Sequence, residues 1–340
     1  MRIARHIQKL EEYVPGEQPA SRSVVKLNTN ENPYPPTPKI EKILANFDLD
    51  RLRRYPDPVF TALREELSRL NKTTAEHIFV GNGSDEILSL AARAFVEDDE
   101  SIGSLDPSYS LYKTLAAIRN VPWVGFEELP KRVHAPQKTT LFLLTNPNAP
   151  TGTFREVKDI ASFAKTFPGV VLVDEAYADF ARDTCMRLAT APKNKNLLVM
   201  RTFSKSYSLA GLRVGYLVGP KDLIRALYKI KDSYNVDALA QAIALVAAKD
   251  QAWMKANTKK VVKTRTWFTQ ELRARGWDVP DSESNFVFAK PPSPLKAEKV
   301  FAALKKQNVY VRYFKGAKTK DRLRITIGTD DEMKKLLSCL

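Results

Sequence analysis

Short apolar runs alternate with amphipathic helical stretches along the middle of this 340-residue chain. The runs at 78–80, 140–144, 170–173 and 197–200 are apolar almost throughout, which is typical of strands that are buried on both faces. Apolar residues at helical spacing fill the stretches at 60–70, 85–95, 109–118 and 155–167. This alternation predicts an α/β fold with a mostly parallel central sheet and helices on both of its faces.

The pattern changes after residue 236. Two long helical stretches, at 237–249 and 251–275, are followed by separated strand patterns at 286–289, 309–312 and 323–327. This order indicates a large domain over residues 31–236 and a smaller α+β domain over residues 237–340.

The beginning of the chain is rich in proline. It contains Pro15, Pro19 and then the string NTNENPYPPTP. Because proline removes backbone donors and fixes φ, we expect residues 1–30 to form an extended N-terminal arm without regular structure, lying across other parts of the molecule.

Composition limits the protein's class and location. An apolar fraction of 44% and a charged fraction of 27% are those of an ordinary globular protein. The two cysteines, Cys185 and Cys339, make neither a disulfide framework nor a metal-ligand spacing, so we expect a reducing compartment and no metal site. The N-terminus lacks the apolar stretch of a secretion signal, and no run is long enough to span a membrane. We therefore expect a cytoplasmic protein without a membrane partner.

The net charge of +15 is the one unusual compositional feature. It is compatible with a nucleic-acid partner, with an anionic substrate, or with solubility alone. Basic residues cluster modestly at 255–265 and 315–324, and the first cluster is typical of a solvated helix face. No RNA-binding sheet signature, zinc-finger spacing or aromatic platform accompanies either cluster, so we expect no nucleic-acid partner.

The string FSKSYSLAGLRVGY, at 203–216, is the most specific motif of the chain. Lys205 can supply an amine for a covalent bond with an aldehyde, Arg213 a planar fork for a phosphate, and Ser204 a further hydrogen bond. A Ser-Lys dipeptide alone would favour a solvated lysine beside a loop. The complete string resembles the cofactor-lysine motif of aminotransferases of the aspartate aminotransferase fold type I, class II, whose cofactor is pyridoxal 5′-phosphate (PLP). Thr202, just before the motif, is assigned to cofactor binding by the same resemblance.

A second segment, IFVGNGSDE, runs from a strand through a glycine turn into a helix that we expect to begin at Ser84 or Asp85. The N-terminus of a helix favours an anion. A dinucleotide fingerprint needs a third glycine where this chain has Glu86, and there is no Walker A loop. Alone the segment is compatible with a simple connection; beside the lysine motif it fits a PLP phosphate cradle formed by Gly83, Ser84 and Asp85.

The string VVLVDEAY ends a buried strand with an acidic residue, at the edge where α/β proteins bind ligands. In PLP enzymes a buried carboxylate keeps the pyridine nitrogen protonated, and we assign this role to Asp174. Tyr177 is placed to hydrogen-bond the ring oxygen. On the residues alone, an N-capping aspartate remains the alternative.

Two further turns follow predicted strands. In TNPNAPTG, Ala149 stands where the family usually has an asparagine that bonds the ring oxygen, so either Asn148 takes over this contact or Tyr177 makes it alone. In DPSYSLY, Tyr109 is equally compatible with stacking on the cofactor ring and with a core position at a helix end.

Taken together, these segments resemble the histidinol-phosphate aminotransferases over essentially the whole chain. The strings that carry the resemblance include YVPG at 13–16, KLNTNENPYPPTP at 26–38, RYPD at 54–57, SYNVDALAQ at 233–241, VYVRYF at 309–314 and LRITIGT at 323–329. The resemblance implies the PLP-dependent transferase fold type I and a homodimer with shared active sites, in which Tyr55 reaches the cofactor phosphate of the other subunit.

The same resemblance implies the substrates. Histidinol phosphate would be the amino donor and 2-oxoglutarate the 2-oxo acid acceptor, in a ping-pong transamination of histidine biosynthesis with Lys205 as the proton carrier. Tyr13 and Asn30 would close over the substrate. Arg324, assisted by Arg312, would hold the carboxylate of glutamate in one half-reaction and the phosphate of histidinol phosphate in the other.

Three alternatives stay open on the sequence. An aromatic amino-acid aminotransferase shares nearly all of these motifs, and a PLP-dependent threonine-phosphate decarboxylase shares the lysine and arginine plan. A regulator with an aminotransferase-like sensor domain would carry a DNA-binding domain ahead of the motifs, where this chain has about thirty residues of arm.

Overall fold

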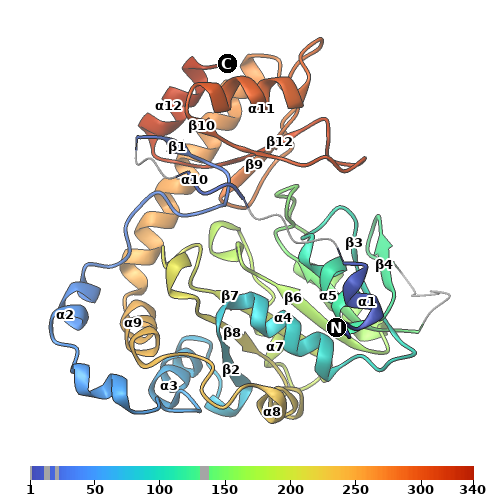
Figure 1. Ribbon diagram of the computed structural model, residues 1–340, viewed down its shortest axis with the longest axis vertical. Coiled ribbons are helices and arrows are strands. Elements are labelled where there is room, and N and C mark those ends of the chain that lie inside the picture. Colours follow the sequence, from blue (N-terminus) through green and yellow to red (C-terminus); the bar gives the residue numbers. More distant parts are fainter. Residues whose placement is uncertain (1, 11–15, 20–22, 131–137) are drawn as a thin grey trace.

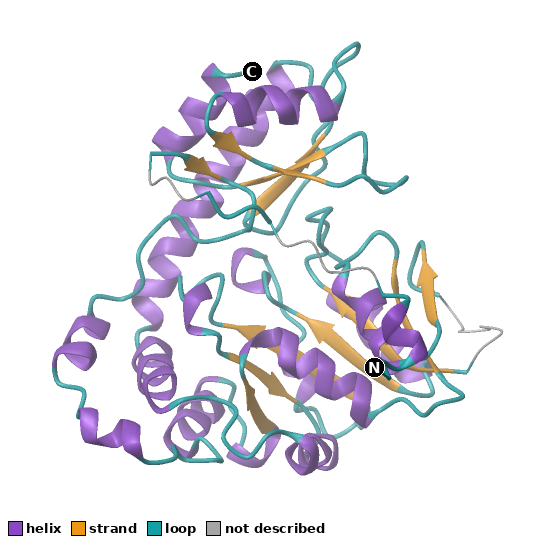
Figure 2. Cartoon of the chain, in the orientation of Figure 1, coloured by secondary structure: helices purple, strands orange, loops and turns teal. Residues whose placement is uncertain are grey.

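The computed structural model describes residues 2–10, 16–19, 23–130 and 138–340. Figure 1 shows a large lobe around an extended sheet and a smaller lobe above it, with the long helix α10 (Gln251–Ala274) running from one to the other. Figure 2 shows helices around the strands of the large lobe, helices above and beside the strands of the smaller lobe, and loops where the two lobes face each other.

A seven-stranded sheet with the order β2-β8-β7-β6-β5-β3-β4 forms the centre of the large lobe. Its strands are β2 (Ile78–Gly81), β3 (Ser101–Leu105), β4 (Trp123–Phe126), β5 (Thr139–Thr145), β6 (Val170–Asp174), β7 (Leu197–Thr202) and β8 (Gly215–Val218). Only β8 runs antiparallel to its neighbours. The expected mostly parallel sheet is confirmed.

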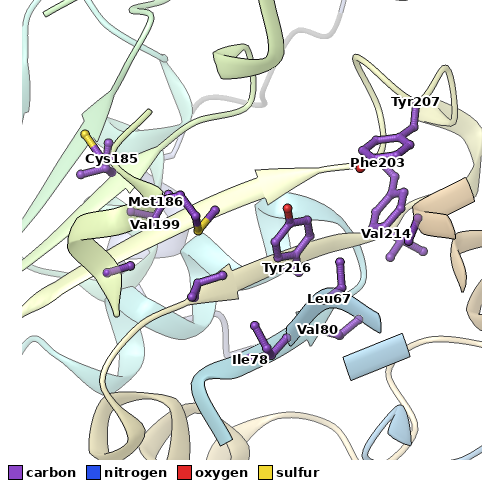
Figure 3. Packing of buried hydrophobic residues seen from close by; sticks show 14 of the residues in the cluster. Leu67, Ile78, Val80, Cys185, Met186, Val199, Phe203, Tyr207, Val214 and Tyr216 are labelled. Atoms are coloured by element: carbon purple, nitrogen blue, oxygen red, sulfur yellow. The ribbon is translucent and has the colours of Figure 1, made fainter. Parts of the chain in front are cut away.

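Successive residues of the strands enter two separate cores. Phe142, Val173 and Val199 face one core, whereas their neighbours Leu172 and Leu198 face the other. The first core is covered by α2 (Lys39–Ala45), α3 (Thr61–Leu70), α6 (Val157–Thr166), α7 (Met186–Ala189) and α9 (Ala238–Lys249), and the second by α4 (Gly83–Ala94), α5 (Leu111–Arg119) and α8 (Lys221–Ile230). Figure 3 shows part of the first core, where side chains of β2, β7 and β8 meet those of α3 and α7. Because side chains alternate along a strand, both faces of the sheet are buried, as expected.

The smaller lobe has its own core around the antiparallel sheet β11-β12-β9. Its elements are α10, β9 (Phe286–Ala289), α11 (Ala297–Lys306), β10 (Val309–Tyr310), β11 (Arg312–Tyr313), β12 (Leu323–Thr326) and α12 (Asp330–Ser338). The single strand expected at 309–312 is wrong: β10 pairs with the arm strand β1 (Val25–Lys26), and β11 pairs with β12. The stretch at 309–313 therefore pairs with two different strands. Its sequence pattern does not indicate this change of partner.

The arm contains two short regular elements, so the expectation of no regular structure is wrong at these places. The helical turn α1 (Arg5–Gln8) lies against α5, and β1 adds a parallel strand beside β10. After β1, the segment Asn28–Asn32, which we call the strap, has no helix or strand. Its hydrogen bonds reach both lobes.

The expected boundary at residue 236 stays a prediction. Helix α9, which that boundary assigns to the small domain, packs against α2 and α3 in the first core of the large sheet. The remaining short elements are η1 (Leu49–Arg53), η2 (Ala75–His77), η3 (Ala178–Phe180) and η4 (Ala210–Leu212). Within the described ranges, no helix is both long and apolar enough to cross a membrane.

Candidate active site

A cavity of about 750 Å³ lies where the ends of the sheet strands meet the strap and the smaller lobe. Ligands of α/β proteins bind at this carboxyl edge of the sheet. Its polar lining residues include some from the strap (Asn28, Thr29, Asn30), the first turn of α4 (Ser84, Asp85), the ends of strands and the loops after them (Thr145, Asp174, Thr202, Ser204, Lys205) and the smaller lobe (Arg312, Arg324).

Asp174 ends β6 and is only 4% exposed. Its carboxylate accepts hydrogen bonds from the Tyr112 hydroxyl at 2.9 Å and from the Ala176 backbone N–H at 3.1 Å. Neither donor carries a positive charge, and burial raises the pKa of Asp174 to about 6. A cationic ring nitrogen in the cavity would therefore be stabilised by this carboxylate.

The sequence reasoning missed Tyr112 and Thr145. The Tyr112 hydroxyl, which is fully buried, lies 2.6 Å from the Thr145 hydroxyl as well as bonding Asp174. Burial and the Asp174 charge raise the pKa of Tyr112 well above its ordinary value. The string DPSYSLY contains Tyr112, and its place on α5 one turn after Tyr109 was the available signal.

Lys205 follows β7 and lines the cavity. Its Nζ donates to the Thr29 backbone carbonyl at 3.3 Å and lies 6.0 Å from the centre of the Tyr177 ring. Burial, together with the nearby Arg324 charge, lowers the pKa of Lys205 to about 8. A minority of the Lys205 amines is therefore neutral near pH 7, and the neutral form is the one that acts as nucleophile and base.

A buried network holds the loop that carries Lys205. Arg201, on β7, donates to Glu175 at 2.9 Å and to Asp179 at 2.6 Å. Asp179 also accepts from the Ser206 hydroxyl, and the strap residue Asn32 donates to the Lys205 backbone carbonyl at 3.1 Å. These bonds join the lysine loop to the segment that follows Asp174.

The first turn of α4 and Arg213 meet at one end of the cavity. Gly83 has a φ of +80°, and a Cβ there would lie 2.6 Å from Nη2 of Arg213. Arg213 pairs with Asp85 at 3.4 Å, and the Tyr109 hydroxyl donates to the same carboxylate at 3.3 Å. Exposed amides at a helix N-terminus and a guanidinium form a site for a phosphate.

Thr202 and Ser204 complete this end of the cavity. The Thr202 hydroxyl accepts the Ser204 backbone N–H at 3.1 Å and donates to the Ser204 hydroxyl oxygen at 3.0 Å. Ser204 lines the cavity, where its hydroxyl can donate to a ligand.

The opposite wall belongs to the smaller lobe. Arg324 lies over the rings of Phe286 and Phe314, each 5.4 Å from its guanidinium carbon, and donates to the Asn28 backbone carbonyl at 2.9 Å. Arg312 lies 5.4 Å over the Phe314 ring as well. Two guanidinium groups thus lie on one wall of the cavity, which suits an anionic substrate.

Residues 22–340 match the family model described as aminotransferase class I and II. The chain belongs to this family. Curated relatives named histidinol-phosphate aminotransferase include a protein of Syntrophotalea carbinolica, 44% identical over 99% of this chain and 98% of its own, and one of Syntrophus aciditrophicus, 40% identical over 98% and 96%.

Solved structures share the fold of this aminotransferase. The histidinol-phosphate aminotransferase of Sinorhizobium meliloti, crystallised with PLP, has a TM-score of 0.89 at 24% identity and covers 99% of this chain and 96% of its own. The L-threonine-O-3-phosphate decarboxylase of Porphyromonas gingivalis has a TM-score of 0.82 at 24% identity, covering 93% and 98%. The fold alone therefore does not separate these activities.

The cofactor of this PLP-dependent aminotransferase fits the residues present. Asp174 would hold the ring nitrogen, Lys205 the aldehyde carbon, and Tyr177 the ring oxygen. The phosphate would lie between the first turn of α4, Ser204 and Arg213. The fit rests on a buried carboxylate whose described partners are neutral, and on the glycine that lets Arg213 reach α4.

The Asn148 side chain makes its hydrogen bonds within the turn that carries it and with the neighbouring segment at Pro107 and Ser108. Its amide donates to the Pro107 carbonyl and to Thr151, and its carbonyl oxygen accepts from the Ser108 hydroxyl at 2.9 Å. The described cavity lining includes the neighbouring Ala149 but not Asn148. The side chain thus braces the turn in the aminotransferase, and its proposed contact with the ring oxygen stays a prediction without support from these contacts.

Of the residues assigned to the other subunit and to the arm, Asn30 is the one that the described cavity lining includes. Tyr55 is 81% exposed and stacks on Tyr234 with a ring separation of 4.3 Å; neither residue is part of the described cavity lining. Tyr13 lies outside the described residues of the aminotransferase. Asn30 does line the cavity, but its amide bonds Tyr177 and Thr326.

Proposed function

We propose that this aminotransferase transfers the amino group of histidinol phosphate to 2-oxoglutarate, giving imidazole acetol phosphate and glutamate in histidine biosynthesis. The observation that carries the proposal is the 40–44% identity, over nearly the full length, to relatives with this name. The two arginines on the smaller-lobe wall support it, because both proposed substrates are anions.

The side of the cavity that the large sheet forms, with Asp174, Tyr177 and Lys205, is called the sheet wall, and its residues act on the cofactor and on the substrate. PLP supplies an aldehyde that bonds amines and a ring that withdraws electrons from them. The Lys205 amine takes the proton from the α-carbon of the substrate, for which a pKa of about 8 is suitable. The Asp174 carboxylate, which is buried, stabilises a positive charge on the ring nitrogen through electrostatics.

Arg324 and Arg312 bind the anionic end of the substrate. A guanidinium fork donates two hydrogen bonds to either a carboxylate or a phosphate. The same residues can therefore bind glutamate and histidinol phosphate in turn. The aromatic rings beneath them, Phe286 and Phe314, hold the guanidinium planes without competing for their N–H donors.

We propose further that two chains form a homodimer with shared active sites. Several large apolar residues are exposed around the segment that carries Tyr55, namely Leu44, Leu49, Leu52, Val59 and Tyr234. Exposed apolar groups in one region are typical of an interface. Tyr55 would reach the phosphate end of the other subunit's cavity. The cytoplasmic location remains an expectation from composition.

A half-reaction tests the substrate. Purified protein loaded with PLP is mixed separately with histidinol phosphate, phenylalanine and threonine phosphate, and cofactor absorbance is followed. Rapid conversion to the pyridoxamine form by low concentrations of histidinol phosphate is expected. A preference for phenylalanine would move the enzyme to the aromatic aminotransferases, and release of carbon dioxide from threonine phosphate would overturn transamination as its main reaction.

A further inference from the structure

Asn30 links the smaller lobe to Tyr177 on the sheet wall through hydrogen bonds. It is 1% exposed and has a left-handed backbone with a φ of 57°. Its backbone N–H donates to the Thr326 hydroxyl at 3.0 Å, and its backbone carbonyl accepts from the Asn285 amide at 2.9 Å. Its side-chain amide lies 2.9 Å from the Tyr177 hydroxyl. One of the two amide N–H groups of this side chain is therefore committed to Tyr177.

The hydroxyl of Thr326 sets the orientation of the Asn30 amide. This hydroxyl accepts the Asn30 backbone N–H and lies 3.1 Å from Oδ1 of the same residue. Among the described residues it has no other hydrogen-bond partner, and it is 2% exposed, so its single proton goes to Oδ1. Oδ1 therefore faces Thr326, and Nδ2 faces Tyr177.

The orientation of the amide decides which way the Tyr177 proton points. Nδ2 is a donor only, so the Tyr177 oxygen must accept from Asn30 and direct its own proton elsewhere. Tyr177 lines the cavity, and Ala149, which belongs to the same apolar cluster, has only a methyl group as its side chain. The remaining direction for the proton is into the cavity.

We propose that Asn30 is a positioning residue that holds Tyr177 as a hydrogen-bond donor toward the ring oxygen of the cofactor. Through Thr326, on β12, and Asn285, this arrangement requires the smaller lobe to stay in place against the strap. The proposal rests on the chain being a PLP-dependent aminotransferase, not on histidinol phosphate being its substrate.

Electrostatics around Tyr177 support the same geometry. The charged groups that act on it or lie beside it are Arg324, Asp174, Asp85 and Lys205. Burial raises the pKa of Tyr177, and both the Arg324 charge and the Asn30 amide oppose this rise. The phenol thus stays protonated at neutral pH and is able to donate.

The test begins with the protein free of cofactor. Tyrosine labelled with ¹³C at Cζ reports the pKa of each phenol by NMR, and Tyr177→Phe assigns the Tyr177 signal. In Asn30→Asp a carboxylate replaces the donor, and we expect the Tyr177 pKa to rise by at least about one unit. Thr326→Val should raise it less, while Thr326→Ser, which keeps the hydroxyl, should match the unaltered protein.

The PLP-loaded variants supply the second readout. In Asn30→Asp the phenol proton turns to the new carboxylate, so we expect kcat to fall about tenfold with little change in KM, and the pH midpoint of the cofactor colour change to rise. Thr326→Val should show the same effects more weakly. Thr326→Ser should behave like the unaltered protein.

Other outcomes overturn the proposal. An unchanged Tyr177 pKa in both Asn30→Asp and Thr326→Val contradicts the role of Asn30. A raised KM with an unaltered pKa would instead place Asn30 in direct contact with substrate. If Asn30→Asp does not fold, the Thr326 pair carries the decision. The NMR titration uses no substrate, so a failure of histidinol phosphate as donor leaves it unaffected.

Discussion

The sheet wall and the smaller-lobe wall of the cavity are built differently. On the sheet wall, Asp174 is buried and hydrogen-bonded, and Lys205 lies on a loop fixed by the Arg201 network. On the smaller-lobe wall, Arg312 and Arg324 lie on aromatic faces, and the nearby Lys318 makes exposed ion pairs. The first wall holds its groups in networks of hydrogen bonds and ion pairs, whereas the second places its guanidinium groups against ring faces.

This difference matches two demands on an aminotransferase. Proton transfer and charge stabilisation need groups that are held in place and shielded from water, because reorganisation during the reaction would raise the barrier. The substrate wall must accept two different anions in turn, so a guanidinium on a ring face is better suited than one locked in a buried ion pair. Substitutions on the two walls should therefore have different kinetic signatures.

Lys205→Ala should have the largest effect. Removing the proton carrier and covalent amine is expected to lower kcat by at least about 10³-fold, within or beyond the range for general acid–base groups. Single-turnover kinetics with the amino donor measure this. Lys205→Arg is the matched variant: it keeps the charge but not a titratable amine, so it should be nearly as inactive. A loss below tenfold in Lys205→Ala would remove Lys205 from the mechanism.

Asp174→Asn should lower kcat by about 10²- to 10³-fold, because the ring nitrogen loses its buried countercharge. Without PLP, the same substitution should raise the stability of the folded protein near neutral pH. Burial raises the folded-state pKa of Asp174 from 3.8 to about 6, so its contribution to stability is greatest below pH 3.8 and is lost as the pH rises through 6.

At pH 7 the Asp174→Asn protein without PLP should therefore be more stable than the unaltered protein, by on the order of 2 kcal/mol. Urea unfolding at pH 4.5 and pH 7 checks the sign: the difference between the two proteins should grow with pH. Equal stability at both pH values would show that the carboxylate is not desolvated as described.

Much of the sheet wall could be predicted from the sequence, because its groups lie in short strings at strand ends. The buried strands were predicted from uniform apolar runs, and Lys205, Asp174 and Arg213 from motifs within a few residues of them. Strands β4 and β8 were missed. The first is a half-exposed edge strand, and the second has only four residues, of which the first two belong to the lysine motif.

Contacts between distant segments could not be predicted. Tyr112 bonds a carboxylate 62 positions away, and Asn30 bonds Thr326 across 296 positions. These side chains are ordinary polar residues until the sheet and the smaller lobe bring them together. The sequence assigned Asn30 to substrate binding because the string NTNENP is typical of the family. The packing shows that the side chain of Asn30 bonds Tyr177.

Arg324→Lys should have an intermediate effect and change binding more than chemistry. A lysine meets the anion as a point charge and loses the two-point contact, so KM should rise about 10- to 100-fold for both substrates. kcat should change much less. Arg312→Lys should act in the same direction but more weakly. Steady-state kinetics with histidinol phosphate and 2-oxoglutarate measure both, and a rise in KM for one substrate only would contradict a shared anion site.

Lys318→Gln should have the smallest effect. Lys318 lies in the loop between β11 and β12 and pairs with Asp106 at 3.1 Å and Glu127 at 3.0 Å, both in the large lobe. All three side chains are exposed to solvent, and exposed pairs contribute little, so kcat/KM should change by no more than about threefold at low salt.

The ionic strength dependence distinguishes this pair from a group that acts on substrate. At about 1 M salt the screening length falls to roughly 3 Å, and the difference between Lys318→Gln and the unaltered protein should disappear. Lys320→Gln is the control, since it removes one charge from the same loop and no ion pair of Lys320 occurs among the described residues. If Lys320→Gln lowers kcat/KM as much as Lys318→Gln, the loop acts through its overall charge on anionic substrates, and the two ion pairs of Lys318 are not the cause.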